Sequence, residues 1–139
     1  MNSTADWMIY LALALFAVAS ILVNPIGDFP LNDDWSFAIS VRDWLETGTY
    51  RIIDWPTMSL FMHLLWGAIW CKVFGFSYTV LRLSTLVIAG VGAWFFAALL
   101  KQINMPAPQR LLFLLVLLFN PLYFHLSFSY MTDVPFCAL

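Results

Sequence analysis

The sequence predicts an all-α integral membrane protein. Of its 139 residues, 63% are hydrophobic and only 10% are charged, whereas ordinary soluble domains carry roughly 25% charged residues. Lipid cannot bond to free backbone groups, so the chain must cross a membrane as helices or as a closed barrel. Its long apolar runs lack the alternation of barrel strands. The net charge of -2 and the absence of a basic tail argue against nucleic acid as a partner.

Three apolar segments are predicted to span the bilayer, and they comprise residues 8–24, 78–100 and 111–130. The first is uncharged and ends at Pro25; a cleaved signal peptide is disfavoured because no basic region precedes it. The second carries Arg82 near one end, where a long side chain can reach the interface. The third is expected to kink at Pro121.

The stretch between residues 28 and 56 is acidic and is predicted to face water. It holds six of the eight acidic residues of the chain. Within it, residues 35–47 predict a short juxtamembrane helix, with Asp34 as its N-cap and Gly48 as its stop. Large aromatic side chains and a charged opposite face suit a helix that lies in the plane of the membrane surface.

Residues 57–74 are apolar and long enough to cross, but they carry His63 in the middle and Lys72 near the end. Length alone leaves both placements open. We expect a second juxtamembrane helix, because that placement keeps the acidic loop and Asp133 on one side of the membrane. A crossing helix would put them on opposite faces.

The connector between the last two spans fixes the expected orientation. It is short and carries Lys101 and Arg110, so it is predicted to face the cytoplasm. The last span then runs outward, and Asp133 emerges on the outer side. We therefore expect a protein of the bacterial inner (plasma) membrane with its acidic residues and active site outside.

Three carboxylates are candidates for chemistry. Asp33 and Asp34 open the first juxtamembrane helix, and Asp133 stands at a later helix boundary. A carboxylate beside apolar surroundings can have a raised pKa and act as a general base, and two acids can hold a divalent cation. The alternative for all three is a helix cap that interacts with the helix dipole.

Other ionisable side chains lie where a ligand could reach them. Arg51 and Arg82 flank the apolar segment 57–74, so either could pair with a lipid phosphate. An ion pair between Arg51 and Asp54 is an equally good explanation. His125 is within reach of the outer surface, although a histidine in an apolar helix is more often a packed one. The same two interpretations apply to His63.

The order of motifs resembles a known family. "LNDDW" is followed by "DWP", "FGFS", "LRLSTLVIAG" and "NPLYFHLSFSYMTDVPF". This order is similar to the N-terminal part of the GT-C membrane glycosyltransferases, in particular the family 39, dolichyl-phosphate-mannose protein mannosyltransferase-like group. The resemblance implies two juxtamembrane helices in the first outer loop. It also implies inverting transfer of a hexose or pentose from a polyprenyl-phosphate carrier to a protein, lipid or glycan acceptor.

The resemblance also implies roles for particular residues. The family's catalytic carboxylate matches Asp33, with Asp34 beside it, and its second acid matches Asp133. We expect the donor to be bound by some of the other ionisable residues, namely Arg51, Asp54, His63, Arg82 and His125. A divalent metal ion is known in some branches only, and Asp34 and Asp133 would hold it; no other cofactor is implied.

One departure from the family concerns the carrier phosphate. Some relatives have a Glu-Lys-Pro-Pro-like stretch before the second juxtamembrane helix, where this chain has "DWPT". Asp54 can replace the acid, but Trp55 supplies no cation. The chain also ends inside an expected helix. We therefore expect the N-terminal part of a longer enzyme, inactive without its C-terminal remainder, with the sugar donor and membrane lipid as further partners.

Two other functions stay open on the sequence. A non-catalytic accessory subunit or carrier-lipid-binding protein would use Asp33 and Asp133 as helix caps. A transporter would line a path with ionisable residues inside its spans, for which His125 is the single mid-span candidate. The sequence also leaves open which of Asp33 and Asp34 is the base.

Overall fold

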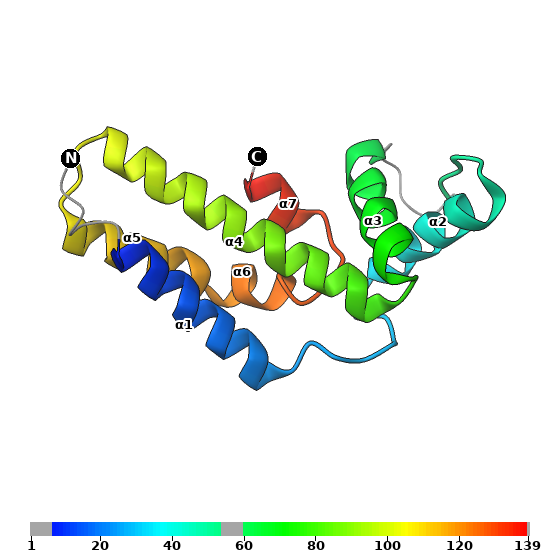
Figure 1. Ribbon diagram of the computed structural model, residues 1–139, viewed down its shortest axis with the longest axis horizontal. Coiled ribbons are helices and arrows are strands. Elements are labelled where there is room, and N and C mark those ends of the chain that lie inside the picture. Colours follow the sequence, from blue (N-terminus) through cyan, green and yellow to red (C-terminus); the bar gives the residue numbers. More distant parts are fainter. Residues whose placement is uncertain (1–6, 54–59, 139) are drawn as a thin grey trace.

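The computed structural model describes residues 7–53 and 60–138, and over these ranges all its regular secondary structure is α-helix (Figure 1). The helices are α1 (Trp7–Val23), α2 (Asp34–Thr47), α3 (Phe61–Phe74), α4 (Tyr78–Gln102), α5 (Ala107–Leu118), α6 (Pro121–Leu126) and α7 (Asp133–Ala138). The predicted all-α class is confirmed. Within the described ranges, α4 alone combines the length and hydropathy that a membrane crossing needs, while α1, α3 and α5 are apolar but shorter.

Helix α4 is the centre of the bundle. It contacts α1, α3, α5 and α7, and Figure 1 shows α1 and α5 along one side of it and α7 on the other. Its contact surface consists of small side chains, since Ala89, Ala93 and Ala97 are fully buried. Small residues let helices approach closely. They pack in one core with residues of α1 and α5, including Ala12, Phe16, Leu114 and Leu118.

Two glycines of α4 have different surroundings. A Cβ atom added at Gly92 would lie 2.6 Å from the Cβ of Ala138, so this glycine is what lets α7 lie against α4. A Cβ atom added at Gly90 would meet nothing within 4 Å. Of the two, only Gly92 serves a helix contact among the described residues.

Helices α2 and α3 form a second core at the end of the bundle where α4 begins (Figure 1). Phe37, Ala38 and Val41 of α2 pack with Leu64, Ala68 and Cys71 of α3, together with Leu81 and Tyr130. The predicted stop is confirmed: Gly48 is the C-cap with φ +70°, and its N–H donates to the carbonyl of Trp44 at 2.9 Å. Helix α3 starts at Phe61, and residues 57–59 of the second predicted helix lie outside the described ranges.

The predicted N-cap of α2 is wrong by one residue. Asp33 occupies the N-cap position, and its side chain makes no capping hydrogen bond. Asp34 is the first helical residue, and its carboxylate accepts from the backbone N–H of Leu31 instead. The helix still benefits from a negative charge in its first turn.

The segment 111–130 is not one continuous helix. Helix α5 ends at Leu118, and α6 begins at Pro121, which has no N–H to continue the ladder. The side chain of Asn120 accepts from the N–H groups of Leu122 and Tyr123 at 3.0 and 3.3 Å. The kink expected at Pro121 is therefore a break with a capped new start.

The loop after α1 is bonded to the first turn of α4. Gly27 and Thr79 bond reciprocally: the Gly27 N–H donates to the Thr79 hydroxyl at 3.0 Å, and that hydroxyl donates to the Gly27 carbonyl at 3.1 Å. The Tyr78 N–H donates to the Asp28 carboxylate at 2.9 Å. The end of α1 and the start of α4 therefore lie at the same end of the bundle. The segment that contains α2 and α3 begins and ends at this place.

Candidate functional site

Asp34 joins three parts of the chain at that end of the bundle. Its side chain is fully buried. One carboxylate oxygen accepts from the Leu31 N–H at 2.8 Å, and the other accepts from the Tyr130 N–H at 3.3 Å. The bond to Tyr130 spans 96 positions in the sequence. Asp34 therefore holds the start of α2 against the segment that leads into α7.

Burial raises the pKa of the Asp34 carboxyl above its ordinary value, because desolvation disfavours the charged form. The two backbone hydrogen bonds and the positive charge of Arg82 oppose that shift, while the negative charge of Asp33 adds to it. Asp34 and Arg82 are thus close enough to interact electrostatically, and Asp33 lies beside them.

Asp33 is exposed, unlike its neighbour. Its backbone carbonyl accepts from the N–H and the hydroxyl of Ser36, at 3.2 and 2.9 Å. Its carboxylate makes no capping bond. The sequence leaves open which of the two acids is the base, and the structure gives them different surroundings. Asp34 is buried and hydrogen-bonded to backbone, whereas Asp33 has its carboxylate at the surface.

Arg82 is 2% exposed and binds the loop that follows α1. Its guanidinium donates to the carbonyls of Pro25 at 3.3 Å and Gly27 at 2.9 Å, and also to that of Phe29. It also lies 4.7 Å from the centre of the Phe29 ring. Both terminal nitrogens bind carbonyls, and the Nε–H is buried without a partner among the described residues, so the geometry favours a structural role over the predicted substrate-binding one.

His63 is packed against Tyr130. The two rings stack with centroids 4.1 Å apart, and Phe37 meets the imidazole edge-on at 5.5 Å. The Tyr130 hydroxyl donates to the His63 carbonyl at 2.5 Å. Among the described residues, neither buried imidazole nitrogen has a hydrogen-bond partner, and burial lowers the pKa of His63 to about 4. His63 is therefore neutral at neutral pH, and its ring contacts aromatic side chains.

Asp133 and His125 lie apart from this group. Asp133 is the exposed first residue of α7 and lines a mainly apolar pocket of about 500 Å³ that α4, α5 and α6 also border. His125 is exposed in the last turn of α6. Among the described residues no hydrogen bond or ion pair joins Asp133 to Asp33 or Asp34. Asp34 is linked to this part of the chain through Tyr130, from whose N–H it accepts and which precedes Asp133 by three residues.

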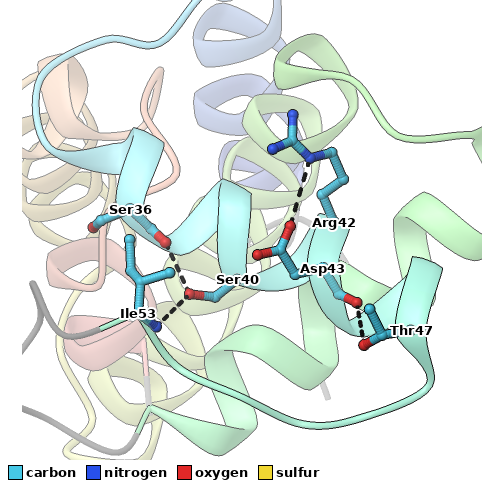
Figure 2. Close-up of polar contacts among 6 residues, drawn as sticks. All are labelled: Ser36, Ser40, Arg42, Asp43, Thr47 and Ile53. Carbon is cyan, nitrogen blue, oxygen red and sulfur yellow. Dashed lines mark hydrogen bonds and ion pairs between the residues drawn. The ribbon is translucent and has the colours of Figure 1, made fainter.

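Arg51 lies beyond the far end of α2. It lines a polar pocket of about 530 Å³ with Asp43, Thr47 and Thr49. Figure 2 shows how the neighbouring backbone is held: the Ser40 hydroxyl donates to the Ser36 carbonyl at 2.9 Å and accepts from the Ile53 N–H at 3.4 Å.

The charges around that pocket are weakly paired. Arg42 and Asp43 form an ion pair of 3.8 Å with both side chains nearly half exposed (Figure 2), so it contributes little stability. Asp54, the predicted partner of Arg51, lies outside the described residues.

The metal site at Asp34 and Asp133 stays a prediction. Each Asp34 oxygen accepts one backbone N–H, and because a carboxylate has about four acceptor sites, these bonds leave lone pairs for a cation. Within the described ranges, no group of three or more His, Cys, Asp or Glu side chains could hold a metal ion.

Sequence reasoning missed Asp28, Thr79 and Tyr130, which carry much of the bonding at this end. Asp28 in "PIGDFP" and Thr79 one residue into a helix are ordinary loop and cap residues when viewed locally. Their bonds span 50 and 52 positions. The sequence contains no local signal for such pairings.

No known protein family, curated protein sequence or solved structure matches this chain.

Proposed function

We propose that this chain is part of a membrane glycosyltransferase that moves a sugar from a polyprenyl-phosphate carrier to an acceptor, with Asp33 as general base. One observation carries the proposal. A surface carboxylate stands next to a buried one, Asp34, whose bonds to Leu31 and Tyr130 hold the site in place. A carboxylate that is open to the surface and whose backbone is fixed by a buried neighbour is suited to act as a general base.

The distribution of side chains supports a membrane location. Large apolar residues point outward from the bundle; Ile21 and Leu22 of α1, for example, are 74% and 80% exposed. Small hydroxyl residues point inward, including Ser20, Ser84, Thr85 and Ser127, and each donates to a carbonyl of its own helix. An apolar exterior of this extent is unfavourable in water and suits lipid.

The bonds between Gly27 and Thr79 support the proposed topology. If α1 and α4 both cross the bilayer, these bonds keep the end of α1 and the start of α4 on one face. Helices α2 and α3 would then lie at that face without crossing. The connector with Lys101 would lie at the opposite, cytoplasmic face, so Asp33 would face outward.

The proposed reaction is a single displacement. Asp33 removes the proton from an acceptor hydroxyl or amine, and the acceptor's lone pair forms a bond to the anomeric carbon. The bond from that carbon to the phosphate oxygen breaks, and its electron pair leaves with the polyprenyl phosphate. Attack opposite to the leaving group inverts the configuration. Arg82 and Asp34 are positioning residues in this scheme, because they bind backbone and not substrate.

The test compares Asp33 with Asp34 in the full-length protein in nanodiscs, with a polyprenyl-phosphate sugar as donor. Asp33→Asn should lower the transfer rate by about 100-fold or more, since a general base contributes that much, and should leave thermal unfolding unchanged. Asp34→Asn should lower stability by about 1–3 kcal/mol, because one of the two backbone N–H groups that Asp34 binds loses its acceptor.

The outcomes separate the competing functions. Near-normal turnover of Asp33→Asn would overturn the assignment of the base. A wild-type protein that binds polyprenyl phosphate without transferring sugar from any donor would point to the carrier-lipid-binding alternative.

A further inference from the structure

Arg110 is a buried cation at the end of the bundle opposite the polar site. It lies in the first turn of α5 and continues the buried face that Leu114 and Leu118 form. It is 7% exposed, and its Nε and Nη1 atoms are buried without a hydrogen-bond partner among the described residues. A guanidinium buried in this way is unfavourable unless an acceptor or an anion meets it.

The chain around Arg110 supplies positive charge and no negative charge. No acidic residue occurs between Asp54 and Asp133, and none of the described acids forms an ion pair with Arg110. Lys101 lies in the last turn of α4, and the connector from α4 to α5 comprises residues 103–106. The partner of Arg110 is therefore expected from outside the described part of the chain.

The first turn of α5 has further donors without a cap. The N-cap is Pro106, whose side chain cannot accept a hydrogen bond, and Pro108 has no N–H. The N–H groups of Ala107 and Gln109 have no partner inside the helix, because no helical carbonyl precedes them. A long helical side chain points back toward the N-terminus of its helix, so Arg110 is directed toward this turn. Helix N–H groups and a guanidinium together are suited to bind a phosphate.

Aromatic side chains mark this end of the bundle as a membrane interface. Figure 1 shows the starts of α1 and α5 and the end of α4 together there. Trp7 and Tyr10 at the start of α1 are 53% and 58% exposed, and Tyr10 meets Trp94 of α4 edge-on with ring centroids 5.6 Å apart. Tryptophan and tyrosine are enriched where the hydrocarbon of a bilayer meets its headgroups. The phosphates of lipid headgroups are the anions available at this depth.

From these observations we propose that the first turn of α5, with Arg110, binds the phosphate of an anionic phospholipid in the cytoplasmic leaflet. The proposal rests on the membrane topology of the proposed function and is independent of sugar transfer. The headgroup supplies the acceptors that Arg110 and the N–H groups of α5 lack within the described residues. A negative headgroup is favoured over a zwitterionic one because the charges of this end are positive.

The test measures lipid binding to the delipidated full-length protein in neutral detergent by native mass spectrometry. The protein is titrated with phosphatidylglycerol and, in parallel, with phosphatidylcholine, which has the same phosphate but no net charge. We expect the wild type to bind phosphatidylglycerol about fivefold more tightly or better. Arg110→Gln should remove this preference.

Arg51→Gln is the matched control, because it removes the same charge from an exposed position beyond the far end of α2. It should keep the preference of the wild type. Equal binding of the two lipids by the wild type, or a preference that survives in Arg110→Gln, would overturn the proposal.

Thermal unfolding distinguishes a lipid phosphate from other partners of Arg110. Without lipid, Arg110→Gln should unfold at the same temperature as the wild type or higher, because it removes a buried charge that lacks a partner. Phosphatidylglycerol should stabilise the wild type and not the variant. A variant that is less stable than the wild type without lipid would place the partner within the protein and contradict the proposal. Inorganic phosphate that stabilises as much as phosphatidylglycerol would contradict a lipid site.

These measurements need no sugar donor, so they separate this proposal from the proposed function. A lipid preference that depends on Arg110 in a protein without transferase activity supports the lipid site alone. Sugar transfer by a protein without that preference contradicts the lipid site and leaves the proposed function standing.

Discussion

Arg82 and Asp34 are opposite charges buried at one end of the bundle, and the hydrogen bonds of both side chains go to backbone groups. Arg82 donates to three carbonyls of the loop after α1, and Asp34 accepts from the N–H groups of Leu31 and Tyr130. A buried charge is tolerable only when it is hydrogen-bonded. These two side chains therefore hold loop segments whose backbone groups are not bonded within a helix. Of the two adjacent aspartates, Asp33 is the one whose carboxylate is exposed and can contact a ligand.

His63 predicts a dependence of stability on pH. Its pKa is about 4 in the folded protein and 6.5 as an ordinary value, so between these values the unfolded chain binds a proton that the folded chain does not. The free energy of unfolding should fall as the pH drops from 6.5 to 4, by about 3 kcal/mol at most. Thermal unfolding in detergent across this range measures the effect.

The matched variant for this prediction is His63→Phe, which keeps an aromatic ring for the stack on Tyr130. Asp34 also titrates with a shifted pKa, so the informative quantity is the difference between the two proteins. Equal losses of stability in acid for wild type and His63→Phe would show that this histidine is not the group responsible.

At the scale of the elements, α4 determines how the other helices pack. Its buried alanines face α1 and α5, and Gly92 faces α7. Between α5 and α6 the chain breaks instead: Phe119 is the C-cap of α5, and the side chain of Asn120 caps the start of α6. Capping by a side chain satisfies backbone N–H groups that a proline break exposes, and a break inside an apolar bundle requires this.

Gly90 and Gly92 form a natural pair for testing that packing. Gly92→Ala should destabilise the protein by about 1–3 kcal/mol, because its Cβ would lie 2.6 Å from that of Ala138. Gly90→Ala should stabilise it by up to about 1 kcal/mol, since alanine is the better helix former and space is available. Thermal unfolding of both variants beside the wild type provides the comparison; two variants shifted in the same direction would contradict this account of α4.

At the scale of the whole molecule, the proposed membrane topology depends on which ends of the helices meet. The bonds between the loop after α1 and the first turn of α4 bring both ends of the α2–α3 segment together. Figure 1 shows α3 running across the end of the bundle, while α1, α4 and α5 run along it.

Cysteine labelling tests this topology. We expect a membrane-impermeant maleimide added outside cells to label Glu46→Cys on α2 and Lys72→Cys on α3, and to reach Gln102→Cys at the end of α4 only after permeabilisation. All three positions are exposed. Cys137 is exposed and is replaced by serine in the background, while buried Cys71 is kept. Labelling of Lys72→Cys only from inside would mean that α3 crosses the membrane.

The sequence predicts the helices more successfully than their junctions. Apolar runs and glycine stops locate α1, α2 and α4 to within a few residues, because these signals are local. The break at Asn120 was expected only as a kink, since a proline alone does not reveal that a neighbouring side chain will cap a new helix. The different environments of Asp33 and Asp34 depend on Tyr130, 96 positions from Asp34, and pairings at that distance have no local signature.

The reciprocal bonds between Gly27 and Thr79 have a consequence for how this protein could change. They hold the two ends of the intervening segment within reach of a single threonine side chain. Once its ends are fixed, a segment can vary in length at small entropic cost. We therefore expect that the segment containing α2 and α3 could be replaced by a segment of different length or sequence. The contact between the end of α1 and the start of α4 would stay the same.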